Sequence, residues 1–322
     1  MSAVDENPKH VGIGLQVPVS DVQIVCHVIM VVLAILGNAT VIVVIGKSVI
    51  QDRRVAHNSN IIIINMAVSN LMVSIMRNIL LIVSDFGIQF LMGVWVWLRS
   101  VNVWSTFYLS VFHLQTLRRV APSVGNLQAS RGVPKTLLLN LLSIWLLNLL
   151  YSIPAHIFST NGNANSTETL MLISTTTRPL LGCVWNFPSS HSGLAYATTS
   201  MVIHEALPIL LMTATNLSSL YMLHTYSRTR TRTSIQHAPV IRGVPAERRA
   251  ARVILILVLL FVVSWGTSVI SVNYFNYNRG TSSEFLLVIA RFAQILFIAL
   301  SPAVLAVGHR GLRSCIKSSL TY

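Results

Sequence analysis

The stretch VQIVCHVIMVVLAILGNATVIVVIG, residues 22–46, decides the fold of this chain. It contains no Asp, Glu, Lys or Arg. A helix needs about 20 mainly apolar residues to cross the roughly 30 Å hydrocarbon layer of a bilayer. The stretch is therefore predicted to span a membrane.

The same pattern recurs along the chain, which is 53% hydrophobic and only 10% charged. A soluble domain usually carries about 25% charged residues. The sequence predicts an all-α membrane protein, a bundle of seven helices, whose third span is less apolar because it contains Arg99. The expected spans are residues 22–46, 58–82, 88–117, 135–156, 194–223, 250–274 and 285–308, preceded by a short N-terminus (1–21) and followed by a short tail (309–322).

The basic residues predict the orientation of these spans. The formal net charge is +14, and 17 of the 23 Lys and Arg fall in the tail and in the loops after the first, third and fifth spans. Only Lys9, Arg178 and Arg279 fall on the other side. Positive residues stay cytoplasmic, so we expect the N-terminus outside and the tail in the cytoplasm. The loops also suit anionic lipid headgroups, and no nucleic-acid partner is needed to explain the charge.

The residues of catalytic and metal sites do not form a recognisable pattern. Cys26, Cys183 and Cys315 lack the spacing of a zinc site or a redox pair. His204-Glu205 lacks the second histidine of a zinc-protease motif, and no phosphate-binding glycine loop follows a strand. We expect no enzyme activity, no metal and no cofactor.

Two modification sites fit the predicted topology. Asn165-Ser166-Thr167 is a glycosylation sequon in the long outer loop, residues 157–193. Cys315 follows the last span in a short basic stretch and is a candidate for palmitoylation, although juxtamembrane cysteines also occur without lipid.

Several motifs, in order along nearly the whole chain, resemble those of the rhodopsin-like receptors that couple to G proteins. Residues 37–38 resemble the Gly-Asn pair of that family's first span, and residues 65–71 (NMAVSNL) its second-span motif. Residues 261–265 (FVVSW) resemble the Phe-x-x-Cys-Trp of its sixth span. Trp145, Pro154 and Pro208 suit its fourth and fifth spans.

The departures from that pattern resemble the type-1 vomeronasal receptors and their fish relatives, the olfactory receptor class A-related proteins. Residues 109–115 (LSVFHLQ) resemble their third-span stretch, and Ser301-Pro302 resembles their seventh-span pair. Arg99 and Asn165 also suit this group. Asn70 stands where the larger family has an aspartate, so we do not expect that family's sodium site.

One further departure concerns a disulfide. Rhodopsin-like receptors usually tie the top of span three to the second outer loop. Cys183 lies in that loop, but residues 86–98 contain no cysteine. We therefore expect no such disulfide and a free thiol at Cys183.

Three arginines and one glutamate lie inside predicted spans. Arg77, Arg99 and Arg291 each fall roughly 28 Å from the expected cytoplasmic end of their helix, and Glu205 lies in the outer half of span five. A charge in the bilayer is costly, so each needs a partner or a role. Each arginine either extends to the outer headgroups or faces a water-filled pocket.

The resemblance places span three centrally, which favours Arg99 as a pocket residue. Arg99 and Glu205 would then be opposite poles that pair in the empty protein. A ligand carboxylate or sulfate would replace Glu205 at the guanidinium, which suits bidentate oxyanion recognition. Aromatic residues deeper than the interfacial belt would hold the apolar body of a small organic ligand, anionic or amphipathic. The candidate ligand-binding residues are Arg99, Glu205, Trp104, Tyr108, Trp265 and Arg291.

The resemblance implies a chemosensory receptor for pheromones or odorants, in the plasma membrane of an olfactory or vomeronasal neuron. Its implied partner is a heterotrimeric G protein of the Gi/Go type. The candidate coupling residues on the inner face are Arg118, Arg119, Arg248 and Arg249. A bitter-type taste receptor is an alternative. A transporter is a weaker one, because paired repeats are absent from the sequence.

Overall fold

The computed structural model describes residues 21–51, 58–82, 88–119, 135–161, 183–185, 187–233, 244–278, 285–308 and 312–313. Asn165 and Cys315 lie outside these ranges. The side chains of Arg77, Cys183, Arg119, Arg248 and Arg249 also lie outside what the structure describes.

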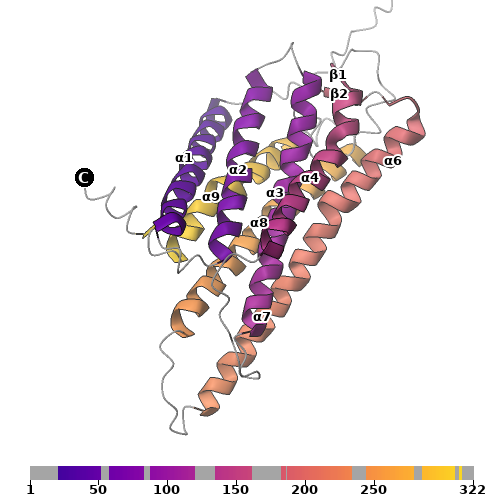
Figure 1. Ribbon diagram of the computed structural model, residues 1–322. Helices are drawn as coiled ribbons and strands as arrows, with labels where there is room; N and C mark the ends of the chain where they lie inside the picture. Colours follow the sequence, from indigo (N-terminus) through magenta and orange to yellow (C-terminus); the bar gives the residue numbers. More distant parts are fainter. Residues whose placement is uncertain are drawn as a thin grey trace, which may run out of the picture.

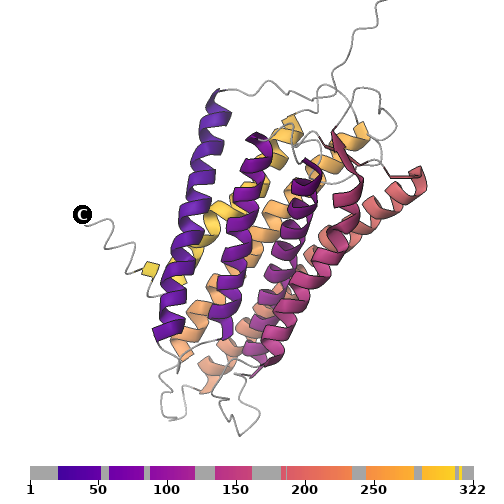
Figure 2. The ribbon, with the colours of Figure 1, turned by 45° about the horizontal axis from the view of Figure 1, so that its top comes forward.

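The described chain forms a bundle of long helices, shown in two views in Figures 1 and 2. Several helices run past the expected spans, because hydropathy marks only the stretch inside hydrocarbon while backbone hydrogen bonding continues into the headgroup region. The helices are α1 (Asp21–Gln51), α2 (Asn58–Ile82), α3 (Ile88–Arg119), α4 (Lys135–Phe158), the continuous α6 (Ser190–Met201), η1 (Val202–Ala206) and α7 (Leu207–Thr233), then α8 (Val244–Asn278) and α9 (Phe285–Gly308).

Helix α3 is the centre of the bundle. It packs against α2, α4, α7 and α8, while α1 closes the ring by packing against α2 and α9. Many of the polar side chains in its middle are buried, among them Ser100, Asn102 and Ser105. A helix enclosed by other helices does not need an apolar surface.

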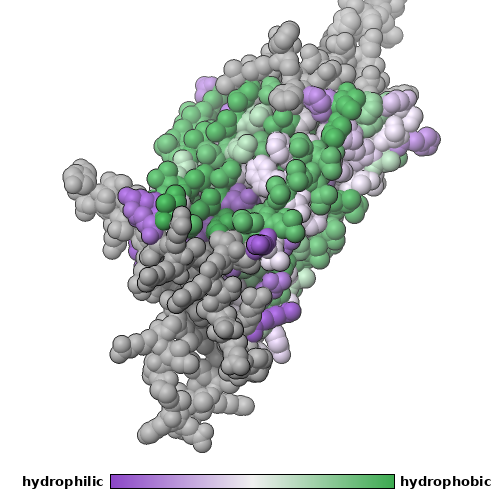
Figure 3. Space-filling view, viewed as in Figure 1, coloured by the Kyte–Doolittle hydropathy of each residue, from purple (hydrophilic) through white to green (hydrophobic). Residues whose placement is uncertain are grey.

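That position explains a difference from the sequence-based expectation. Six helices of the described chain are long and apolar enough to cross a membrane by length and composition, and α3 does not meet that composition. The helices around α3 meet that composition, and their apolar side chains form the green outer surface in Figure 3. Val22, Ile50 and Ile270 are each more than two-thirds exposed, as expected of residues that face lipid.

A small sheet interrupts the all-helical expectation. Strand β1 (Ser159–Asn161) directly follows α4, and it pairs antiparallel with β2 (Cys183–Trp185). Thr160 lies opposite Val184 in the register. The short strands carry little hydropathy signal, which explains why the sequence did not indicate them.

A network of buried amides joins four helices of the interior. Asn38 donates to the backbone oxygen of Ile298 in α9, and Asn70 donates to Asn38 and to Ser301. Asn102 of α3 donates to Asn70 and to Ser69. Asn70 is therefore an uncharged hub between α1, α3 and α9.

Helices α1 and α9 approach closely at Gly37. A Cβ at this glycine would lie 2.8 Å from Cγ and 2.9 Å from Cβ of Pro302. The proline ring is rigid, so the helices would have to separate. At Gly46, also in α1, nothing lies within 4 Å of such a Cβ.

We expect Gly37→Ala to destabilise the protein by about 1–3 kcal/mol, because overpacking forces the backbone to shift. Gly46→Ala should be neutral or stabilising by up to about 1 kcal/mol, since alanine favours a helix. Thermal unfolding of the purified proteins in detergent measures both. Equal melting temperatures for the two variants would contradict the close approach.

Replacing Asn102 with alanine removes two interhelical donors and leaves Asn70 without one of its partners. We expect a loss of about 1–2 kcal/mol in the free energy of unfolding. Thr40→Ala is the matched control, because exposed Thr40 bonds only within α1, to the backbone oxygen of Leu36. A melting temperature of Asn102→Ala as high as that of the control would show that the network contributes nothing to stability.

Candidate functional site

A buried ion pair lies at the middle of the bundle. Nη2 of Arg99 in α3 lies 2.6 Å from Oε1 of Glu205 in η1. The two side chains are 11% and 2% exposed. Arg99 lies roughly 16 Å along α3 from Ile88, and its guanidinium binds Glu205 inside the protein.

A π-helical turn brings Glu205 to this position. Pro208 has no backbone N–H, and its ring would clash with the carbonyl oxygen four residues earlier in a regular helix. The chain instead forms η1, in which the N–H of Leu207 bonds to the carbonyl oxygen of Val202. The wider turn turns two consecutive residues inward, and both His204 and Glu205 are buried.

Trp265 of α8 forms the third side of the site. The guanidinium carbon of Arg99 lies 4.8 Å from the centroid of the Trp265 ring. A cation over an indole face is attracted by the electrons of the ring. Arg99 is therefore held between an anion on η1 and an aromatic ring on α8.

The aromatic surroundings continue from Trp265 along α8 and α9. Trp265 stacks on Phe261 with ring centroids 5.2 Å apart, and Phe261 meets Phe297 of α9 edge-on at 4.9 Å. A change at Arg99 is thus connected by direct contacts to the core between α8 and α9.

A second aromatic group lies on the other side of Glu205. Nε1 of Trp104 donates to Nδ1 of His204 at 3.2 Å. The ring of His204 lies 4.1 Å from that of Tyr151 in α4, which stacks on Tyr196 in α6. These rings form an apolar wall between α3, α4 and α6.

The structure brings some of the candidate residues together and separates others. Arg99, Glu205 and Trp265 are in contact, and Trp104 joins them through His204. Tyr108 lies roughly 13 Å further along α3 than Arg99, where its hydroxyl accepts a hydrogen bond from Asn140 of α4. Arg291 lies in the second turn of α9, partly buried.

The inner end of α3 carries one described coupling candidate. Arg118 is exposed in the last turn of α3. The backbone of Arg119 continues that turn, and Arg248 and Arg249 lie in the first turns of α8. Of these four, the structure shows exposure for Arg118, which is accessible to a partner.

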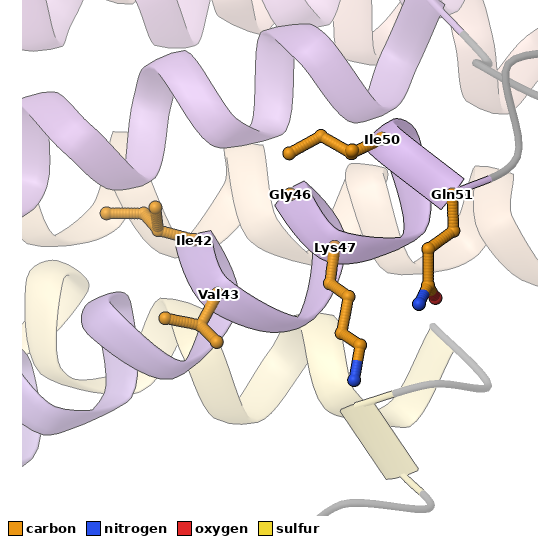
Figure 4. Close-up of a pocket in the computed structure, with 6 residues that line it drawn as sticks. All are labelled: Ile42, Val43, Gly46, Lys47, Ile50 and Gln51. Carbon is orange, nitrogen blue, oxygen red and sulfur yellow. The ribbon is translucent and has the colours of Figure 1, made fainter.

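A separate groove lies at the end of α1 (Figure 4). It is lined by Ile42, Val43, Gly46, Lys47, Ile50 and Gln51. Val43 and Ile50 are 66% and 77% exposed. The groove is open to the membrane and includes none of the candidate ligand-binding residues.

The arrangement suits binding rather than catalysis. Within the described ranges, no group of three or more His, Cys, Asp or Glu side chains could hold a metal ion. The ion pair provides two opposite full charges beside flat aromatic rings. Such a site can hold a small polar molecule with an apolar body.

Sequence reasoning missed three features of the site. It did not place Trp265 beneath Arg99, it did not pair His204 with Trp104, and it did not indicate the π-turn. Pro208, three residues after Glu205, was the available signal for the turn, because a proline inside a span needs a local adjustment.

Comparisons with known proteins agree on the architecture. Residues 37–304 match the family described as 7 transmembrane receptor (rhodopsin family). The chain is 41% identical over 296 residues to "Olfactory receptor class A-like protein 4" of Danio rerio, covering 89% of this chain and 86% of that protein. The fold resembles the crystal structure of squid rhodopsin with a TM-score of 0.66 and 16% identity, over 91% of this chain and 78% of that chain.

Removing one charge of the pair should be more harmful than removing both. We expect Glu205→Gln to destabilise the protein by about 3 kcal/mol, because a buried guanidinium loses its counter-charge. The double variant Arg99→Gln/Glu205→Gln should recover part of this loss, since two neutral amides can bond to each other. Thermal unfolding in detergent gives the comparison, and a double variant that loses the sum of the two single losses would contradict it.

Proposed function

Because the chain belongs to the rhodopsin family of seven-transmembrane receptors, we propose that it is a chemosensory receptor that binds a small organic ligand and activates a heterotrimeric G protein. This family consists of signalling receptors and not of enzymes. The observation that carries the ligand part of the proposal is the buried Arg99–Glu205 pair, in contact with the ring of Trp265.

The chemosensory role is supported by the relative in Danio rerio. That protein is named an olfactory receptor class A-like protein, and 41% identity over nearly the whole of both chains favours a shared kind of function. A bitter-type receptor would share the fold, but the named relative favours olfaction. Family membership favours a receptor over a transporter.

The ligand that we propose is small, with an anionic or amphipathic character. Its acidic group would bind the guanidinium of Arg99, and its apolar body would lie against Trp104 and Trp265. Arg291 and Tyr108 remain candidates for contacts with a larger body. Glu205 would leave its partner when the ligand enters.

Activation follows from differential affinity for two arrangements of the helices. A ligand that takes Arg99 from Glu205 loosens the link between α3 and η1. It also changes the cation–π contact with Trp265, which packs against Phe261 and through it against Phe297. The ligand shifts the population only by the free energy with which it prefers the active arrangement.

The proposed setting follows the positive-inside distribution. The N-terminus and the loop that carries the sequon at Asn165 would lie outside, and the tail would lie in the cytoplasm, with Cys315 available for a lipid. A Gi/Go-type protein would dock against Arg118, Arg119, Arg248 and Arg249. The receptor would act in the plasma membrane of an olfactory or vomeronasal neuron.

We expect cells that express the chain, with sensors for the four G-protein classes, to answer a panel of small acids, amino acids, steroids and amines through Gi/Go. Arg118→Ala/Arg119→Ala should reduce the maximal response several-fold at equal surface expression, because two positive charges leave the docking face. Lys135→Ala, an exposed residue at the start of α4, is the control. Full coupling of the variant that lacks both arginines would show that they do not contact the G protein. No response from any of the four sensors would refute the function.

A further inference from the structure

The charge balance of the ion pair limits the ligands that can displace it. The pair contains one positive and one negative group and is neutral as a whole. Both side chains are nearly inaccessible, at 11% and 2% exposure. Removing a charge from water is costly, and the cost is offset only while an opposite charge is adjacent.

A ligand with an acid alone would make the site negative. Its carboxylate would take the guanidinium of Arg99, and Glu205 would lose the positive group that lies 2.6 Å away. A ligand with an amine alone would take the carboxylate of Glu205, and Arg99 would lose the negative group with which it pairs. A ligand that brings both charges replaces each member of the pair and keeps the site neutral.

We propose that the ligand is a zwitterion, a small molecule with an acidic and a basic group on one apolar body. This inference rests on the proposed function, since it names the ligand class of the same site. The acidic group binds Arg99, and the ammonium group binds Glu205. The two groups enter between α3 and η1 as the pair separates.

Further donors beside Arg99 suit the acidic group. Nε1 of Trp265 is buried and has no hydrogen-bond partner among the described residues. The same holds for the hydroxyl of Ser268, one turn further along α8. A buried donor without an acceptor is costly, and a carboxylate oxygen at the guanidinium would provide an acceptor close to the Trp265 ring.

His204 provides another donor on the Glu205 side. Its Nδ1 accepts the hydrogen bond of Trp104, so a neutral ring carries its proton on Nε2. That Nε2 is buried without a hydrogen-bond partner in the described part of the chain. A neutral histidine adds no charge next to Glu205, and its Nε2–H would suit an acceptor atom on the body of the ligand.

The test uses matched ligands that differ only in their charged groups. One set is phenylalanine, 3-phenylpropionate and 2-phenylethylamine. Others are ω-amino acids of three to six carbons, each with its matched acid and amine, so that the distance between the charges varies. The full-length receptor is purified for thermal-shift binding and expressed in cells with G-protein sensors.

We expect at least one zwitterion to raise the melting temperature and to bind about tenfold or more tightly than its matched acid and amine, as charge-assisted hydrogen bonds imply. Glu205→Gln should weaken the zwitterion and strengthen the matched acid, because the acid no longer strands a carboxylate. Arg99→Gln should do the reverse and favour the amine. Thr213→Ala, exposed and bonded within its own helix to Ile209, should change none of the affinities.

The outcomes separate this inference from the proposed function. Acids that bind wild type as tightly as their zwitterions, or a panel in which no zwitterion binds, would overturn the inference. If acids alone also activate a G protein, the receptor function stands without it. Zwitterion binding with the predicted reversal in both variants, but with no G-protein response, would support the ligand class and refute the function.

Discussion

A polar side chain inside this bundle cannot reach bulk water, because protein surrounds it and lipid surrounds the protein. Each such group therefore needs a partner within the protein, on its own helix or on another. Arg99 finds Glu205, and Asn102 finds Asn70 and Ser69. Both originate on α3, so the polar groups of this one helix set the positions of α2, η1 and α8 around it.

The amide network and the ion pair have different roles. The amide network of Asn38, Asn70 and Ser301 contains no charge and joins α1, α2 and α9 to α3. This network holds the helices in fixed positions, because each of its hydrogen bonds is buried and joins uncharged groups. The ion pair, in contrast, holds opposite charges that a ligand can replace. The site that can change therefore lies next to a part of the bundle that is held in place.

The sequence predicted the helices and the two poles of the site but not the geometry between them. Hydropathy located the spans, and the cost of a buried charge identified Arg99 and Glu205 as residues that need a partner. Hydropathy is lower in α3 than in the other spans, because α3 is surrounded by helices and its buried polar side chains do not face lipid. The inward turn of His204, the ring of Trp265 beneath Arg99 and the β1–β2 pair depend on tertiary contacts, which single-residue patterns do not contain. Tyr108 had the depth expected of a pocket residue, but its direction toward Asn140 could only come from the rotation of α3.

The polar character of α3 has a consequence for how the protein is made. Arg99 and Glu205 are 106 residues apart in the chain. During synthesis the ribosome completes α3 and α4 before Glu205 exists, so the guanidinium of Arg99 reaches the membrane before its partner in the ion pair. A helix that is too polar to enter lipid alone would stay near the translocon, or pack against α2 and α4, until η1 has been synthesised. The ion pair can therefore form only after the fifth span has been made, so it closes the bundle late in synthesis as well as holding its site.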